Sequence, residues 1–399
     1  MLSRSIINTT RFQSRQLAKS AIGSYTSRLA PSSVKFATAG SVNKIMSRSI
    51  TTAKSIIYSE HGVPKDVISV HTHQLPDPKD NEVILKSLGF PINPSDINQL
   101  EGVYPSKPEK TTQYGTEKPS AIAGNEGLFE VIEKGSNVKL ELGDHVIPLH
   151  SNSGTWTSHQ IAPEDQLIKL PKDVSVIFGA TISVNPTTAY QLVNDFGLEK
   201  GDWLIQNAGT SAVSQAVSQI AKTKGINVIS VIRDRPNLQE IKDKLVKQGA
   251  AKVITEEENG DRTVGGEISK LTQGKIKIAL NSVSGKSSSN ISRKLAPGGT
   301  IITYGGMSKQ PVTLPTSLFI FKDIKAIGFW VTEGNKRDPE GKRQTINELV
   351  KLYQNGHLEE LQVHSNEWNY DSFSDEQIKN LIVDALENSS GGKQFITVK

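Results

Sequence analysis

The chain has 399 residues and an ordinary globular composition, with 36% hydrophobic and 22% charged residues, which suits about two domains. It contains no cysteine, and this excludes disulfides, thiol catalysis and cysteine-bound zinc. No apolar run approaches the ~20 residues that a membrane-spanning helix needs. The formal net charge is +5, but its distribution along the chain argues against a nucleic-acid partner.

The N-terminal segment, residues 1–54, is basic and rich in Ser and Thr. It contains nine of the 46 lysines and arginines, whereas the first acidic residue is Glu60. The rest of the chain has 37 basic against 41 acidic residues, so nothing there favours nucleic acid. The pattern predicts a mitochondrial transit peptide over residues 1–54 and a matrix location. A disordered basic tail that binds an acidic partner is the alternative interpretation.

Short strands separated by Gly- and Pro-rich turns dominate residues 55–170 and predict a compact, largely β domain. After the second strand, Pro94 or Ser95 can open a short helix. A loop over residues 101–120 follows and carries Tyr104. A loop this long inside a compact domain is usually functional or disordered. The predicted strands are Ser55–Tyr58, Glu82–Phe90, Gly124–Ile132 and the end of Leu142–Pro148.

The centre of the chain, residues 202–235, has the pattern of a β-α-β unit. Trp203–Gln206 is a short apolar strand, and the small polar residues Asn207–Ser211 suit a tight turn. Apolar residues at helical spacing follow, and Gly225 stands where a helix C-cap glycine belongs. Val228–Ile232 is a second, β-branched strand.

Alternation of helices and strands continues toward the C-terminus and predicts a parallel sheet with helices on both faces. The final segment, Phe395–Val398, is predicted to be a strand that returns to the first domain. Helices are expected over residues 174–197, 237–248, 284–296 and 344–355, and later strands over Ile276–Leu280, Thr300–Tyr304 and Lys325–Trp330.

The two strand ends of the β-α-β unit indicate a dinucleotide site. A helix N-terminus that follows small residues favours a phosphate. Arg233-Asp234-Arg235 follows the second strand, where arginines accept a 2′-phosphate, so the pattern favours NADPH over NADH. The glycine fingerprint is incomplete, because Gly209 is followed by Ser211, Ala212 and Ser214. A β-α-β unit that binds no nucleotide is the alternative.

Several segments, in this order, resemble the medium-chain dehydrogenase/reductase superfamily. They are Gly124-Asn125-Glu126-Gly127, Leu142-Gly143-Asp144-His145-Val146, the β-α-β unit and Pro297-Gly298-Gly299-Thr300. The resemblance implies an α/β protein with a GroES-like, β-rich catalytic domain over residues 55–188 and 342–399. A Rossmann domain with a doubly wound parallel sheet is implied over residues 189–341.

Zinc-dependent members of this superfamily have a histidine ligand where this chain has Asn125, so the resemblance implies a zinc-free member. His71 and His73 alternate on a probable strand and could bind a metal in principle. Because no third ligand is near them in the sequence, a solvated strand face is the favoured interpretation.

Further motifs resemble the mitochondrial trans-2-enoyl-thioester reductases of the quinone-oxidoreductase-like branch. The resemblance runs from about residue 55 to the end. It implies NADPH-dependent reduction of enoyl thioesters, carried on acyl carrier protein or CoA, in mitochondrial fatty acid synthesis. It also implies a homodimer joined near residues 325–331. The motifs are Phe90–Gln99, Gly102-Val103-Tyr104-Pro105, Arg233–Pro236, Tyr304–Pro311 and Gly328-Phe329-Trp330.

The same resemblance assigns roles to single residues. Tyr104 occupies the position of the family's proton donor, and Asn185 matches the asparagine of its Val-Asn-Pro motif. The remaining implied NADPH contacts are Thr210, Ser211, Ala212 and Val213 at the pyrophosphate, Arg233, Asp234 and Arg235 at the 2′-phosphate, Tyr304, Gly305, Gly306, Met307, Phe329, Trp330 and Val331 at the nicotinamide, and Lys393 near the C-terminal strand.

Reduction of an enoyl thioester needs a hydride at the β-carbon and a proton at the α-carbon of the resulting enolate. A tyrosine suits the proton step, because its hydroxyl is protonated at matrix pH. Asn93 and Asp96 are expected to orient the loop and substrate. The loop lysines Lys107, Lys110 and Lys118 could meet an acidic carrier protein or a CoA phosphate, or be merely solvated.

Two other functions stay open at this point. A quinone oxidoreductase of the same superfamily would transfer hydride to a quinone without a proton-donating tyrosine in this loop. A non-catalytic NADPH-binding regulator would also fit the incomplete glycine fingerprint. Only the enoyl thioester reductase should lose turnover but keep its cofactor when Tyr104 becomes Phe.

Overall fold

The computed structural model describes residues 51–399, so the predicted leader up to residue 50 lies outside the described residues. The first element is β1 (Thr52–Tyr58), and Ala53 within it is fully buried. The predicted leader boundary at residue 54 therefore falls inside a strand. A boundary before Thr52 leaves that strand whole.

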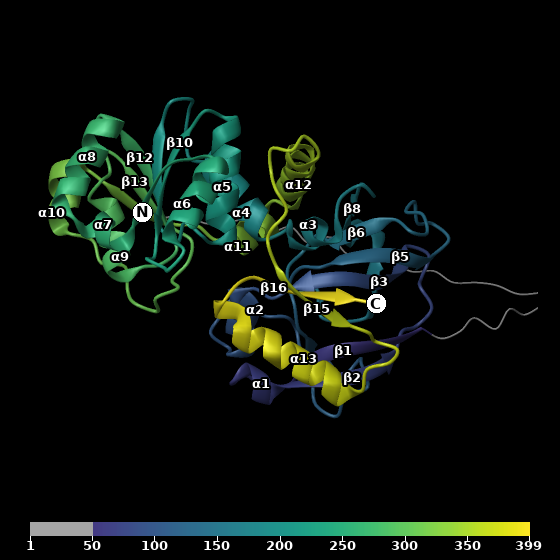
Figure 1. Ribbon diagram of the computed structural model, residues 1–399. Coiled ribbons are helices and arrows are strands. Elements are labelled where there is room, and N and C mark those ends of the chain that lie inside the picture. The colour runs from purple at the N-terminus through teal and green to yellow at the C-terminus, as the bar shows by residue number, and fades with distance from the viewer. Residues whose placement is uncertain (1–50) are drawn as a thin grey trace, which may run out of the picture. The chain divides into compact units, whose positions relative to one another are not determined.

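A β-rich part contains a sheet of three strands, in the order β2-β1-β4, and a sheet of seven. The larger sheet follows the order β15-β16-β3-β5-β6-β8, with β7 paired to β3 (Figure 1). β16 pairs antiparallel with β3, which confirms the predicted return of the C-terminal strand. The elements of this part are α1 (Pro64–Val67), β2 (Ile68–Gln74), β3 (Glu82–Pro91), α2 (Pro94–Leu100), β4 (Ala121–Ile122), β5 (Leu128–Lys134), β6 (His145–Pro148), β7 (His159–Pro163), β8 (Leu167–Leu170), α3 (Val176–Thr181), β15 (His364–Trp368), α13 (Asp375–Glu387) and β16 (Gln394–Val398).

The other part is built on a parallel sheet of six strands, in the order β11-β10-β9-β12-β13-β14. The chain passes from β9 outward to β11 on one side, then returns to β12 on the other, which is the predicted doubly wound order. Its elements, with the connecting helix α12, are α4 (Asn185–Asn194), β9 (Trp203–Gln206), α5 (Ala212–Thr223), β10 (Asn227–Ile232), α6 (Leu238–Lys247), β11 (Ala250–Thr255), α7 (Glu256–Gly260), α8 (Arg262–Thr272), β12 (Ile276–Asn281), α9 (Gly285–Ser292), β13 (Thr300–Thr303), α10 (Thr316–Lys322), β14 (Lys325–Gly328), α11 (Val331–Arg337) and α12 (Pro339–Gln354).

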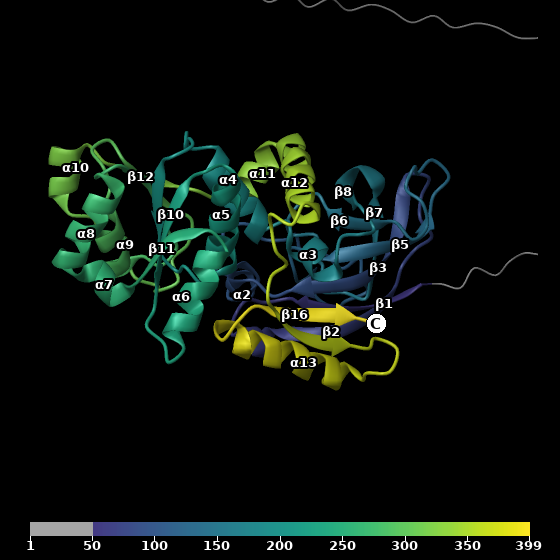
Figure 2. The same ribbon diagram turned by 45° about the horizontal axis from the view of Figure 1, so that its top comes forward.

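Alternate residues of the parallel strands face two different cores, as the two-residue period of a strand requires. Leu204 and Val228 pack with α5, whereas Ile205 and Ile229 pack with α8, α9 and α10 on the opposite face (Figure 2). The core on the α5 side also includes Leu128 of the β-rich part. None of the helices in residues 51–399 has the length and apolar character needed to cross a membrane.

Several predicted elements differ from the structure. The strand expected over Gly124–Ile132 is β5, which begins at Leu128, and the helix expected over residues 344–355 is α12, which begins at Pro339. The single helix expected over residues 174–197 is two helices, α3 and α4, because Pro186 occupies the first turn of α4, where its missing N–H costs no hydrogen bond. The strand expected to reach Trp330 ends at Gly328, because its neighbour β13 ends at Thr303, the residue paired with Gly328.

Candidate active site

The carboxyl ends of β9 and β12 meet at the point where the strand order reverses, which is where open α/β sheets bind ligands. Asn207, at the end of β9, is fully buried and ties the two strands together. Its side-chain Nδ2 donates to Asn281 Oδ1 at 2.8 Å, and its side-chain Oδ1 accepts from Ser282 N at 2.8 Å. These bonds join the ends of β9 and β12 beneath the turn that follows β9.

That turn packs closely against the neighbouring strand, although its glycine fingerprint is incomplete. Ala208 adopts a positive φ of 49°. A Cβ on Gly209 would lie 2.9 Å from both Ile232 Cγ2 and Ser230 Cβ, so only glycine fits there. Ser211 caps α5 by accepting from Ser214 N at 3.2 Å. The turn leads directly into the N-terminus of a 12-residue helix, which is where the predicted pyrophosphate contacts lie.

The predicted 2′-phosphate residues lie beyond the end of β10, beside this turn. Arg235 Nη2 donates to Thr210 Oγ1 at 3.4 Å, which joins the two predicted groups. Asp234 accepts from the backbone N–H of Arg235 at 2.9 Å. Arg233 is exposed. One oxygen of the Asp234 carboxylate thus accepts from the backbone of the next residue, and Arg233 and Arg235 are the cationic side chains at this end of β10.

The predicted nicotinamide segments lie next to one another. Phe329 N donates to Thr303 O at 2.9 Å, immediately before Tyr304. Burial raises the pKa of Tyr304, and the nearby hydroxyls of Ser282, Ser214 and Ser211 oppose this shift. The Tyr304 hydroxyl is therefore buried near the N-terminus of α5, where none of the described residues forms a hydrogen bond with it.

Tyr104 comes from the β-rich part and meets the predicted nicotinamide segment. Trp330 Nε1 donates to the Tyr104 hydroxyl oxygen at 2.7 Å, and Thr332 Oγ1 hydrogen-bonds with it at 3.2 Å. The Tyr104 and Trp330 rings pack edge to face, with centroids 5.8 Å apart. Its hydroxyl is thus fixed beside the residues implied to line the nicotinamide.

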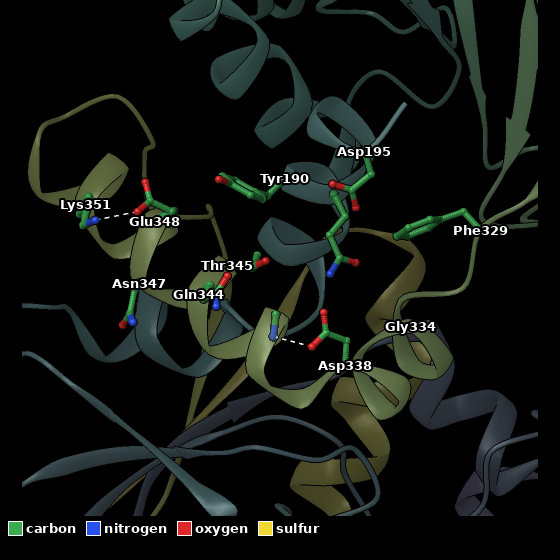
Figure 3. Close-up of a pocket in the computed structure, with 12 residues that line it drawn as sticks. Tyr190, Asp195, Phe329, Gly334, Asp338, Gln344, Thr345, Asn347, Glu348 and Lys351 are labelled. Atoms are coloured by element: carbon green, nitrogen blue, oxygen red, sulfur yellow. Dashed lines mark hydrogen bonds and ion pairs between the residues drawn. The ribbon is translucent and has the colours of Figure 1, made fainter. Parts of the chain in front are cut away.

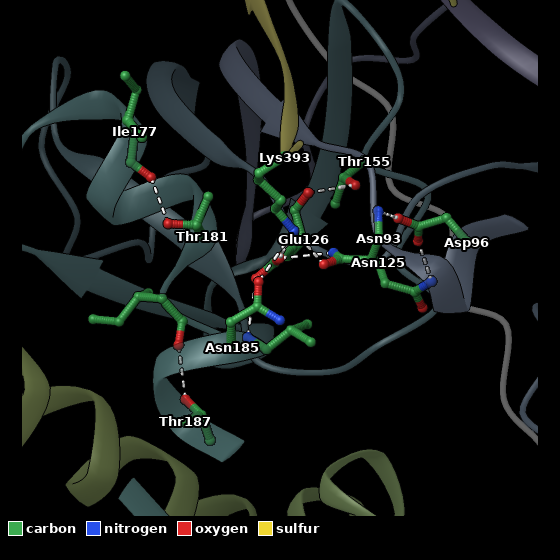
Figure 4. A network of polar contacts seen from close by, with 12 residues as sticks. Asn93, Asp96, Asn125, Glu126, Thr155, Ile177, Thr181, Asn185, Thr187 and Lys393 are labelled. Atoms are coloured by element: carbon green, nitrogen blue, oxygen red, sulfur yellow. Dashed lines mark hydrogen bonds and ion pairs between the residues drawn. The ribbon is translucent and has the colours of Figure 1, made fainter. Parts of the chain in front are cut away.

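Lys393 and Asn185, both implied cofactor contacts, form a second cluster (Figure 4). Lys393 Nζ donates to Asn185 Oδ1 at 3.1 Å and to Asn93 Oδ1, and lies 4.0 Å from Glu126 Oε1. Burial lowers the pKa of Lys393, whereas Glu126 and Asp96 raise it.

Glu126 and Asp96 are buried carboxylates that the sequence did not identify as a pair. Glu126 accepts from Asn93 Nδ2 at 2.8 Å and from Val184 N at 3.0 Å. Asp96 accepts from Asn93 N at 2.7 Å and from Asn125 Nδ2 at 2.6 Å. Burial raises the pKa of both groups. The bond between Asn93 and Asp96 is a local capping box at the start of α2, whereas the bonds of Glu126 to Asn93 and Val184 and of Asp96 to Asn125 join segments distant in sequence.

A cavity of about 630 Å³ lies beside this site, between α4 and α12 (Figure 3). Of the predicted site residues, Phe329 lines it, together with polar residues such as Gln191 and Glu348. The Phe329 ring also packs 6.2 Å from that of Phe196. Phe329 therefore faces a different environment from its neighbour Trp330.

Two of the three loop lysines have partners inside the chain. Lys110 Nζ donates to Ser59 O at 2.7 Å, and Lys118 pairs with Glu60 at 3.0 Å. These contacts attach the loop to the end of β1. They weaken the interpretation of Lys110 and Lys118 as free anchors for a carrier protein.

Neither Asn125, at the family's zinc position, nor the separate pair His71 and His73 is arranged to bind a metal. The Asn125 amide is hydrogen-bonded to Asp96 and Gln99. His71 Nε2 instead hydrogen-bonds with Tyr114 O at 2.7 Å, and the His71 ring stacks on His73. Across residues 51–399 no group of three or more His, Cys, Asp or Glu side chains is placed to hold a metal ion.

Comparison with known proteins identifies both parts. Residues 79–172 match the family described as alcohol dehydrogenase GroES-like domain, and residues 212–354 match the family described as zinc-binding dehydrogenase. A mitochondrial enoyl-acyl-carrier-protein reductase from Kluyveromyces lactis is 49% identical over 369 residues, which cover 89% of this chain and 96% of that one.

The chain belongs to the family of mitochondrial enoyl-acyl-carrier-protein reductases, in the medium-chain dehydrogenase/reductase superfamily. A relative from Kluyveromyces marxianus, 51% identical over 87% of this chain and 94% of its own length, is called an NADPH quinone oxidoreductase. A structure of the enoyl thioester reductase of Candida tropicalis has a TM-score of 0.84 and 48% identity, and covers 87% of this chain and 100% of that one. Etr1p in complex with NADP and crotonyl-CoA has the same score, identity and coverage.

Membership of this reductase family confirms the predicted superfamily and its two-part fold. The single-residue roles come from position in the motifs, and the structure supplies their geometry. It brings Tyr104 to Trp330, Arg235 to Thr210, and Lys393 to Asn185. The Met307 side chain is 63% exposed, and its backbone N–H donates to Ser282 O, which attaches this segment to the end of β12.

Proposed function

We propose that this protein reduces trans-2-enoyl thioesters to saturated acyl thioesters in the mitochondrial matrix, with NADPH, as the last reductive step of mitochondrial fatty acid synthesis. The observation that carries the proposal is the position of the Tyr104 hydroxyl, 2.7 Å from Trp330 Nε1 in the segment implied to line the nicotinamide. A quinone reductase needs no such proton donor.

Bound NADPH would supply the hydride that reaches the β-carbon of the substrate. Tyr104 then donates its proton to the α-carbon of the enolate. The Trp330 N–H already points at the phenol oxygen and stabilises the phenolate left by this transfer. Thr332 gives the hydroxyl a second partner at 3.2 Å, which fixes its direction.

The residues present fit this cofactor. Gly209 lets the turn after β9 pack against β10, and Arg235 Nη2 lies 3.4 Å from Thr210 Oγ1 at the proposed phosphate end. The Lys393 ammonium and the Asn185 amide add polar groups at the other cluster. This arrangement supports the assignment of NADPH rather than NADH.

The test compares the full chain with Tyr104→Phe. We expect crotonyl-CoA to drive NADPH oxidation by the wild type, and the variant to lose turnover by about 100-fold or more, as for a lost general acid. The dissociation constant for NADPH, measured by fluorescence titration, should differ by less than about twofold between the variant and the wild type.

If the wild type reduces quinones and reduces none of the enoyl thioesters tested, the protein is the quinone oxidoreductase suggested by the Kluyveromyces marxianus relative. NADPH binding without turnover on either substrate would identify the non-catalytic regulator. Equal turnover of wild type and Tyr104→Phe would contradict the proposed proton donor.

We also propose that the protein accepts substrates on acyl carrier protein and acts as a homodimer joined along β14. All four residues of that edge strand are exposed. Exposed apolar side chains of α10 extend the same surface, with Ile320 66% and Phe321 79% exposed. An unpaired strand edge flanked by apolar residues is suited to pairing with a second copy.

A further inference from the structure

The loop that carries Tyr104 is fastened to α2 on both sides of that residue. On the N-terminal side, Asn98 O accepts from Tyr104 N at 3.1 Å and from Val103 N at 3.0 Å. On the C-terminal side, Gln99 Nε2 donates to Ser106 O at 2.8 Å. The last turn of α2 therefore holds the backbone two residues beyond Tyr104 as well as Tyr104 itself.

A second amide reinforces the C-terminal anchor. Asn152 Nδ2 donates to Ser106 Oγ at 2.9 Å, and Asn152 Oδ1 accepts from Gln99 Nε2 at 2.6 Å. Asn152 adopts a positive φ of 63°, a conformation that asparagine tolerates better than most residues. Its backbone geometry thus serves to aim this side chain at Ser106 and Gln99.

Asn125 connects both amides to the buried polar network beneath them. It donates to Gln99 Oε1 at 2.7 Å and to Asp96 Oδ1 at 2.6 Å, and accepts from Asn152 N at 3.0 Å. Gln99 is 3% exposed and Asn125 is 8% exposed. Buried polar groups of this kind hold a defined geometry only when all of them are satisfied, which is the case for the Gln99 amide.

We propose that Gln99 and Asn152 are positioning residues that fix the Tyr104 hydroxyl for proton transfer. The inference rests on the proposed function, in which Tyr104 is the proton donor. Neither amide contacts the Tyr104 hydroxyl, so both act through Ser106: Gln99 binds its backbone oxygen and Asn152 binds its side-chain hydroxyl. A displacement of the donor of about 1 Å can reduce the rate by about 100-fold.

The test is a double-mutant cycle on the full chain. Gln99→Met keeps the length of the side chain and removes both polar atoms of its amide, Oε1 and Nε2. We expect it to lower kcat by about tenfold with little change in KM or in NADPH binding. In the Tyr104→Phe background the same substitution should lower kcat by less than about twofold, because no proton donor remains to be positioned.

Gln219→Met is the matched control. Gln219 is also buried, at 7% exposure, and its amide accepts from Glu359 N at 2.8 Å, away from the Tyr104 loop. It should change thermal stability comparably and leave kcat within about twofold. A loss of kcat in both backgrounds by the same factor would overturn the proposal, because a structural defect is additive with loss of the donor.

Asn152→Gly provides an independent variant should Gln99→Met fail to fold. Glycine accepts the positive φ of this position without strain, and the change removes both side-chain bonds. A reduced kcat that again disappears in the Tyr104→Phe background supports the proposal, and unchanged kcat contradicts it. If Tyr104→Phe itself keeps full turnover, the assignment of Tyr104 as the proton donor fails, which is distinguishable from a failure of the positioning alone.

Discussion

At the scale of single residues, the site depends on buried charges. Glu126 is 2% exposed, and two N–H donors and the Lys393 ammonium face its carboxylate. Asp96 from α2 and Lys342 from α12 are the other charged groups of the cluster. Lys393 lowers and Asp96 raises the pKa of Glu126, and the Glu126 carboxylate in turn raises the pKa of Lys393 and of Lys342.

Glu126 should make stability depend on pH in an unusual direction. Burial raises its pKa from 4.5 to about 7, against the opposing effect of Lys393. The folded chain therefore binds more protons than the unfolded chain between these two values, so the free energy of unfolding falls as pH rises through that window. The size of this loss is on the order of 3 kcal/mol for a fully buried group.

Urea unfolding of wild type and Glu126→Gln at pH 5, 6, 7 and 8 measures this effect. The stability of wild type relative to the variant should fall between pH 5 and 8, whereas any fixed cost of the new amide is the same at every pH. Glu267→Gln, on the exposed side of α8, should give a curve parallel to wild type. Parallel curves for Glu126→Gln would show that the carboxylate titrates in its ordinary range.

Local motifs made some of these residues predictable, but their partners were not. Tyr104 and Arg235 lie in short segments whose residue types carry the chemistry. The bond between Gln99 and Asn152 joins residues 53 positions apart, and the one between Lys393 and Asn185 joins residues 208 positions apart. Contacts of this kind depend on tertiary packing, which leaves no periodic pattern in the sequence.

At the scale of elements, the turn between β9 and α5 packs closely against β10 although its glycine fingerprint is incomplete. Gly209 meets Ile232 and Ser230 of the neighbouring strand, where any side chain would collide. Ser214, at the position of a later glycine, is fully buried and donates through its hydroxyl to Asn207 O at 3.2 Å. A small hydroxyl thus replaces a glycine at no steric cost.

Gly209→Ala should therefore weaken NADPH binding and destabilise the fold by about 1–3 kcal/mol, because the new Cβ forces β10 away from the turn. Gly265→Ala is the matched control, since nothing lies within 4 Å of a Cβ built at this position in α8. Alanine there should stabilise by about 0.5–1 kcal/mol. Thermal unfolding measures the stability of both variants, and fluorescence titration measures their affinity for NADPH. Equal stability and equal affinity of the two variants would refute the steric argument.

Element prediction succeeded where periodicity was strong and was incomplete elsewhere. The face of α5 formed by Val217, Ile220 and Ala221 is buried, as its spacing indicates. Helix α13 was not predicted, although Ser374 and Gln377 form a capping box at its start. The C-terminal end of α13 is hard to predict, because the helix continues into the 3-10 turn Asn388–Ser390 instead of ending at a glycine cap.

At the scale of the whole molecule, the two parts meet through Tyr104 and through a shared core. The edge strand β14 stands at the end of the six-stranded sheet, with Ile327 41% exposed. Trp330 follows this strand by two residues and binds the Tyr104 hydroxyl. An interface along β14 would therefore lie close in sequence to the donor's hydrogen-bond partner, so assembly and catalysis should be linked.

Ile327→Asp together with Phe321→Asp should convert the proposed dimer to monomers, because two carboxylates would be desolvated at the interface. Sedimentation velocity on the full chain measures the mass, and Leu142→Asp, at a 59% exposed apolar residue in a turn of the β-rich part, is the control. We expect the β14 variant to lose at least about threefold in kcat because the adjacent Trp330 segment loosens. A monomeric wild type would contradict the interface, whereas a monomeric variant with full activity would show that dimerisation and the position of Trp330 are independent.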